Sequence, residues 1–221
     1  MSTTLKPFGL KPAFHPSGLD RSTPFAGTNS YVTGTPNFSA GYTLSSGQAF
    51  YQYQPVAITS TGELTIAEAA AANGGVYGSF DGVEFTDSQG RRSVAKWASK
   101  LTLDASTDIV FWIFSDPALV YEAQVNGSAT TAAIGSEYNF STASGYAPED
   151  GISIGNGGAG FSTTALAAAP VASGAQGQVR VVGLGREAAY PAGETNAWGD
   201  SYTIVQVQIA EHQNVADRAA Y

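Results

Sequence analysis

The stretch of residues 22–62 constrains the fold most, because it contains no Asp, Glu, Lys or Arg but carries seven aromatic residues. A disordered segment usually combines high charge with few aromatic residues, so this stretch is not of that type. Its first part, up to about Ser46, is interrupted by Pro and Gly and has neither helical nor strand periodicity. We therefore predict that residues 1–46 form an extended arm that binds through spaced aromatic side chains, with an arm folded back over its own domain as the alternative. The predicted anchors of this arm are Phe8, Phe14, Phe25, Tyr31, Phe38 and Tyr42.

From residue 47 onward, apolar and polar residues alternate with the two-residue period of β-strands. Only 13% of the residues are charged and 26 are Gly, which favours short strands joined by tight turns over helices. We predict that residues 47–221 form one all-β domain, a β-barrel or a β-sandwich. The strands are expected at 50–54, 64–66, 76–86, 93–97, 109–114, 121–125, 179–181 and 205–209.

Three local expectations follow from these patterns. Residues 109–114 are apolar on both faces, which predicts a central strand with Trp112 in the core. In the strand that follows, Tyr121, Ala123 and Val125 should face one way and Glu122 and Gln124 the other. A short helix is possible at residues 164–169, ended by Pro170.

Charge and composition exclude several classes of function. The net charge is −8, and the ten Lys and Arg residues are scattered, so we expect no nucleic-acid partner. The chain has no Cys, which excludes disulfides and thiolate metal sites. The longest strongly apolar run, residues 109–114, is too short to cross a bilayer, and residues 1–10 lack an apolar core of signal-peptide length. We therefore expect a protein made inside the cell without a membrane partner.

The sequence offers little for catalysis. Residues 155–160 match the dinucleotide pattern GxGxxG, but the preceding strand is short and the acidic residue that binds ribose is missing, so we interpret the match as chance. The two His residues, His15 and His212, could meet in space, but a metal site would need further ligands at suitable spacing. We predict no catalytic residue, no metal, no cofactor and no enzyme activity. Carboxylate pairs for the hydrolysis of glycosidic bonds could be assembled from Asp81, Glu84 and Asp87 or from Asp104, Asp108 and Asp116, all at turns or strand ends.

Trp198 is the aromatic residue best placed for a surface contact, because it lies in a loop of polar and small residues. We expect it to contact another subunit. The alternative is a carbohydrate-binding domain in which Trp198 and Tyr190 bind a sugar.

Several short segments, in the same order along the chain, resemble one family. The first are residues 7–12 (PFGLKP) and 15–18 (HPSG), followed by 78–85 (GSFDGVEF) and 96–97 (KW). The others are 116–117 (DP) with 121–124 (YEAQ), 134–135 (IG), 179–184 (VRVVGL) and the strand leading to His212. Together they resemble the cement, or decoration, proteins of tailed bacteriophages, small virion proteins usually encoded near the major capsid gene.

The resemblance implies a β-barrel or β-sandwich subunit, a homotrimer, bound to the major capsid protein on the outer surface of the capsid where capsomers meet. It implies no cofactor and no catalytic residue. A protein of this kind stabilises the shell by adding weak contacts over several subunits. We expect residues 1–46 to tether it to the shell or to sister subunits. A tail or spike component of the virion is the alternative within the same structural class.

Overall fold

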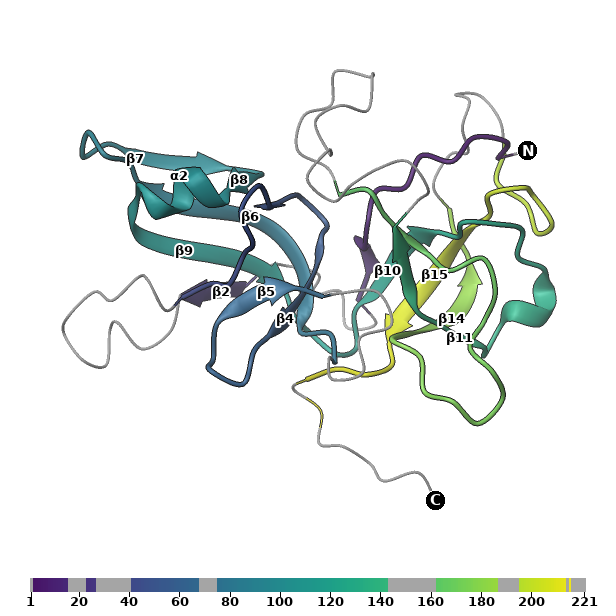
Figure 1. The fold of residues 1–221 in the computed structure, drawn as a ribbon. Helices are drawn as coiled ribbons and strands as arrows, with labels where there is room; N and C mark the ends of the chain where they lie inside the picture. The colour runs from purple at the N-terminus through teal and green to yellow at the C-terminus, as the bar shows by residue number, and fades with distance from the viewer. Residues whose placement is uncertain are drawn as a thin grey trace.

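A computed structural model describes residues 2–15, 23–26, 41–67, 75–142, 162–186, 195–213 and 215 of the chain. Antiparallel strands dominate it, which confirms the predicted all-β class. Figure 1 shows two lobes side by side, each built around one sheet. Both sheets are open, since the order of hydrogen-bonded strands in each has two ends among the residues described.

The first sheet has five strands in the order β1-β10-β15-β14-β11. It combines the beginning, middle and end of the chain, so its strand pairs are mostly distant in sequence. A separate pair, β12 (Phe140–Thr142) and β13 (Thr164–Leu166), contributes to the same core. The strands of the first sheet are β1 (Lys11–Phe14), β10 (Val120–Gln124), β15 (Ile204–Ile209), β14 (Val179–Leu184) and β11 (Glu137–Tyr138).

The second sheet has six strands, with the order β2-β9-β6-β4-β5 and β7 paired to β6. This lobe also contains a short pair of strands, β3 (Ala49–Phe50) and β8 (Ala98–Ser99), and the helix α2 (Lys100–Asp104). The 3-10 helix η2 (Thr131–Ala133) lies in the first lobe. The strands of the second sheet are β2 (Thr23–Ala26), β9 (Thr107–Phe114), β6 (Gly78–Thr86), β4 (Pro55–Ile58), β5 (Leu64–Ile66) and β7 (Arg92–Ala95).

Each lobe has its own hydrophobic core. In the second lobe, Phe50 stacks on Phe80 with ring centroids 5.5 Å apart, and Phe111 meets Phe50 edge-on at 5.3 Å. The core of the first lobe is instead built mainly from aliphatic side chains of β10, β14 and β15 around the buried Tyr121. The burial of these side chains is the main favourable contribution to the folding of either lobe.

A joint that contains several buried polar groups connects the two lobes. Leu10 is fully buried there, its N–H donating to the Tyr53 carbonyl at 2.8 Å and its carbonyl accepting from the Ser79 hydroxyl at 2.6 Å. Gln54, before β4, donates to the Thr164 hydroxyl at 3.0 Å and accepts from the Ser162 hydroxyl at 2.9 Å. Because these buried groups satisfy one another across the joint, we expect the lobes to keep a fixed relative position.

Most of the expected strands are present. Residues 64–66 and 109–114 lie in β5 and β9, and β9 is central, between β2 and β6. The strand expected at 76–86 corresponds to β6, whose pairing with β9 shifts register near Gly82 and Glu84. Residues 93–97 contribute β7, which pairs with β6.

Other local predictions were wrong. The strand expected at 50–54 is broken because Tyr53 has a φ of 64°, so β4 begins only at Pro55. Residues 164–166 form the strand β13 rather than a helix, because they pair with β12. Trp112 is only half-buried: Ile109, Phe111 and Ile113 take the core-facing positions of β9, and Trp112 lies on the other face.

The described parts of residues 1–46 lie against the protein itself. Strand β1 pairs with β10, strand β2 pairs with β9, and Leu44 lies in the core of the second lobe. Of the two arrangements expected for this segment, these residues adopt the one folded back over its own domain. The rest of the segment lies outside the described residues.

Candidate functional site

The predicted arm anchors are spread over both lobes. Phe8 is half-buried and Phe14, at the end of β1, is 39% exposed. The backbone of Phe25 lies in β2 opposite Phe111. Tyr31 and Phe38 lie outside the described residues.

Tyr42 packs on its own lobe. Its ring meets Phe111 edge-on with centroids 6.0 Å apart, and its hydroxyl donates to Asp104 Oδ1 at 2.8 Å. Burial and the neighbouring Asp104 carboxylate raise the pKa of the Tyr42 hydroxyl. Tyr42 therefore fixes residues near position 42 to α2.

Trp198 is half-buried and packs against the core of the first lobe. Tyr190, its partner in the carbohydrate-binding alternative, lies outside the described residues. Trp198 thus has at most part of its ring available to a partner.

The first candidate carboxylate group forms separate contacts along β6 and its turn. Asp81 Oδ1 lies 2.8 Å from Lys96 Nζ, and Glu84 Oε1 lies 2.8 Å from Arg92 Nε. The backbone N–H of Arg91 is the main cause of the lowered pKa of the Asp87 carboxyl, and the N–H of Gln89 also binds it. These groups stabilise a hairpin, and nothing in their arrangement suggests a pair working on one substrate.

The second group is divided between two places. Asp104 and Asp108 remain in the second lobe, bound to Lys100 and Thr86. Asp116 lies in the connection from β9 to β10, where His15 Nε2 comes within 3.2 Å of its Oδ1. The N–H of Ala118 lowers the pKa of Asp116 most, and His15 lowers it further.

His212 is the second His residue near Asp116, so the two His residues do approach a common carboxylate. Burial lowers the pKa of His212. Nevertheless, the part of the chain that the structure describes contains no group of three or more His, Asp or Glu side chains able to hold a metal ion. The GxGxxG match at 155–160 falls outside it.

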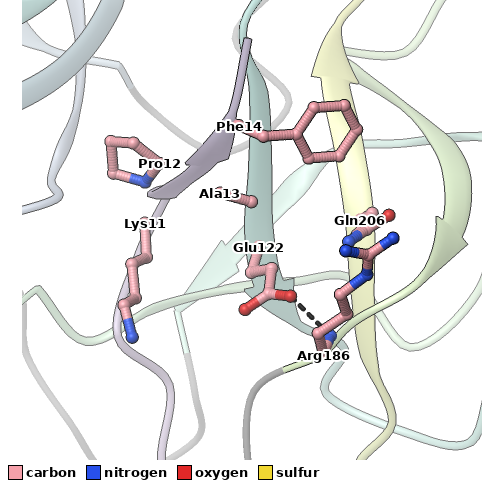
Figure 2. A pocket seen from close by; sticks show the side chains of 7 residues that line it. All are labelled: Lys11, Pro12, Ala13, Phe14, Glu122, Arg186 and Gln206. Carbon is pink, nitrogen blue, oxygen red and sulfur yellow. Dashed lines mark hydrogen bonds between the residues drawn. The ribbon is translucent and has the colours of Figure 1, made fainter. Parts of the chain in front are cut away.

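A polar site lies on the outer face of the first sheet (Figure 2). Lys11 on β1 pairs across the sheet with Glu122 on β10, and Glu122 pairs with Gln206 on β15. Direct cross-strand neighbours have side chains on the same face, so these three form a row over adjacent strands. Gly183 on β14 continues the row and leaves space beside the Gln206 amide.

This row forms the floor of a shallow hollow with a volume of about 340 Å³. We call it the β1–β15 hollow. Figure 2 shows Phe14 at one end and the Arg186 side chain extending toward Gln206, while Glu122 Oε1 accepts the backbone N–H of Arg186 at 2.5 Å. Its full lining is Lys11, Pro12, Ala13, Phe14, Glu122, Arg186 and Gln206.

The sequence indicated only part of this site. Its alternation placed Glu122 and Gln124 on the face opposite Tyr121, which is correct, but both are also buried. Gln124 is covered because the N-terminal segment crosses it: the Lys6 N–H donates to its Oε1 at 2.7 Å, and its Nε2 donates to the Thr4 carbonyl at 3.1 Å. Apart from Phe14, the sequence named none of the residues of the hollow as a site residue, since they come from four distant segments.

Among the described residues, no helix is long and apolar enough to cross a membrane. Comparisons with family models, with curated proteins and with solved structures found no match to this chain.

Proposed function

We propose that the chain is a structural protein of a virus particle, a cement protein that binds the major capsid protein on the outer surface of a tailed-phage capsid. The observation that carries the proposal is the ordered resemblance, whose segments supply strands to both sheets. Residues 78–85 lie in β6 of the second sheet, and residues 121–124 and 179–184 lie in β10 and β14 of the first. The low charge of the chain supports the same role, because a surface poor in charges suits contact with other subunits.

The end of the second lobe is the surface that we propose to contact the shell. Val94 on β7 is 74% exposed and Leu101 on α2 is 81% exposed, and Figure 1 shows β7 and α2 at the same end of the molecule. Exposed apolar side chains on elements at one end of a molecule can contribute to a contact surface. In a homotrimer each subunit would present this end, and three weak contacts would act together.

The experiment is rebinding of the purified protein to capsids from which it has been removed. A trimer by mass in solution that returns to the shell at a fixed ratio and raises its resistance to heat is the expected result. A monomer that does not bind the shell contradicts the proposal, and recovery of the protein from tails instead of capsids supports the tail alternative.

A matched pair of variants tests the proposed contact surface. Replacing Val94 and Leu101 by Asp should abolish rebinding, because charged groups in a contact lose hydration without a partner. Ile134, an exposed apolar residue of the other lobe, provides the control, and Ile134→Asp should rebind normally. Equal rebinding of both variants would exclude Val94 and Leu101 from the contact.

We propose that residues 1–46 tether the protein to the shell or to sister subunits, and the test of this tether uses substitutions rather than a deletion of the segment. Removing the segment would delete β1 and β2 and with them the partners of β10 and β9. Replacing Tyr31 and Phe38 by Ala leaves those strands in place, and lower capsid occupancy with an unchanged unfolding midpoint would support the tether. Unchanged occupancy would argue against it.

A further inference from the structure

The Gln206 side chain in the β1–β15 hollow has an unmatched hydrogen-bond donor. Gln206 is only 8% exposed, and its Nε2 is buried with no hydrogen-bond partner among the residues described. Buried amide groups are nearly always paired, so a buried unpaired N–H that lines a hollow indicates a missing acceptor.

Gln124 shows how the same face satisfies a neighbouring amide. It lies two residues beyond Glu122 on β10, on the same outer face, and its Nε2 donates to the carbonyl of Thr4. There the acceptor is supplied by the chain's own N-terminal segment. No described segment supplies one to Gln206, so an external acceptor oxygen is the expected partner.

The charges around the hollow select the kind of acceptor. The lining contains two cationic side chains, Lys11 and Arg186, and one carboxylate, Glu122, so it carries a net charge of about +1 in a protein of −8. The carboxylate of Glu122 accepts the backbone N–H of Arg186. Within the part of the chain that the structure describes, the Arg186 guanidinium makes no hydrogen bond or ion pair of its own.

We propose that the β1–β15 hollow binds a carboxylate group. The Gln206 Nε2 donates to one carboxylate oxygen and the guanidinium of Arg186 to the other, because the planar guanidinium fork suits a carboxylate. The partly exposed ring of Phe14 contacts the aliphatic carbons next to the carboxylate. Such a group can come from an acidic side chain of a partner protein or from a free small acid. The proposal does not depend on the capsid role.

The test is a titration of the full chain followed through the side-chain amide NMR signals of Gln206. The probes are N-acetyl-glutamate N-methylamide, which represents an acidic side chain, and propionate, which represents a free acid. N-acetyl-glutamine N-methylamide and propylammonium are the controls for shape and for charge. We expect a saturable shift with a carboxylate probe, weakened by salt, and none with the two controls.

Variants locate the site. Arg186→Gln and Gln206→Leu should each weaken binding about tenfold, the loss expected for one charge-assisted hydrogen bond. Arg180→Gln is the matched control, since Arg180 is an exposed Arg of the same sheet that pairs with Glu137 outside the hollow, and its binding should be unchanged. A backbone amide spectrum identical to that of the unmodified chain verifies the fold of each variant.

The outcomes separate clearly. Stronger binding of the glutamate probe assigns the site to an acidic segment of a partner, and equal binding of propionate assigns it to any small carboxylate. Equal binding of the glutamine or ammonium probe, no binding of either carboxylate, or full binding by Arg186→Gln would each overturn the proposal.

Discussion

Gly9 lies in the joint between the lobes in a conformation that only Gly adopts easily. Its φ is +78°, its N–H donates to the Thr164 carbonyl at 3.1 Å, and the next N–H, of Leu10, donates to the Tyr53 carbonyl at 2.8 Å. A Cβ added at Gly9 would lie 2.0 Å from the Tyr53 carbonyl oxygen and 2.7 Å from Ser162 Cβ. Gly9→Ala should therefore force the two lobes apart at this point.

The magnitude follows from three contributions. A non-Gly residue at positive φ costs about 1–2 kcal/mol. The Cβ must move at least about 1 Å from the Tyr53 oxygen to reach the closest contact of 3.0 Å, which breaks the Leu10 hydrogen bond and costs about 1–3 kcal/mol for the buried groups. The reduced freedom of the unfolded chain offsets about 0.4–1 kcal/mol. We expect the free energy of unfolding to fall by roughly 2–4 kcal/mol.

Gly47→Ala is the matched control. Gly47 also has a positive φ, +86°, but an added Cβ would meet nothing within 4 Å. It should show only the conformational cost, about 1 kcal/mol. Urea unfolding of both variants measures the difference, and a Gly9→Ala variant no less stable than Gly47→Ala would refute the steric argument.

Three further predictions concern stability. Burial lowers the pKa of His212 from its ordinary 6.5, so the unfolded chain takes up a proton at a higher pH than the folded chain. The free energy of unfolding should therefore be at its full value above pH 6.5 and fall below it. Urea unfolding of His212→Gln should show a smaller fall over the same pH range. Asp200 is buried and accepts the N–H of Ser2 at 2.7 Å. Asp200→Asn should lower the free energy of unfolding by about 1–3 kcal/mol and speed amide hydrogen exchange at Ser2. Unchanged exchange at Ser2 would contradict this. Phe111→Ala should lower the free energy of unfolding, measured by thermal unfolding, by about 3–5 kcal/mol. Val94 is exposed on β7, so Val94→Ala should change that free energy by less than about 0.5 kcal/mol. Similar effects of the two variants would place Phe111 outside the core.

The sequence by itself determined the all-β class and most of the strands. The alternation of Val179 and Val181 with Arg180, and of Val205 and Val207 with Gln206, appears in β14 and β15 because the side chains of a strand point alternately to its two faces. This period is local, so it can be recognised without knowing the partner strand. It also placed Glu122 correctly on the face opposite Tyr121.

Only the tertiary structure decided which strands meet. The pairing of Lys11 with Glu122 and of Glu122 with Gln206 joins three distant segments, and it produces the β1–β15 hollow. The half-burial of Trp112 has the same origin, since an apolar strand does not reveal which of its faces will be covered. Strand pairing depends on burial summed over the whole chain, whereas periodicity reports each strand alone. For that reason the elements could be predicted and the site could not.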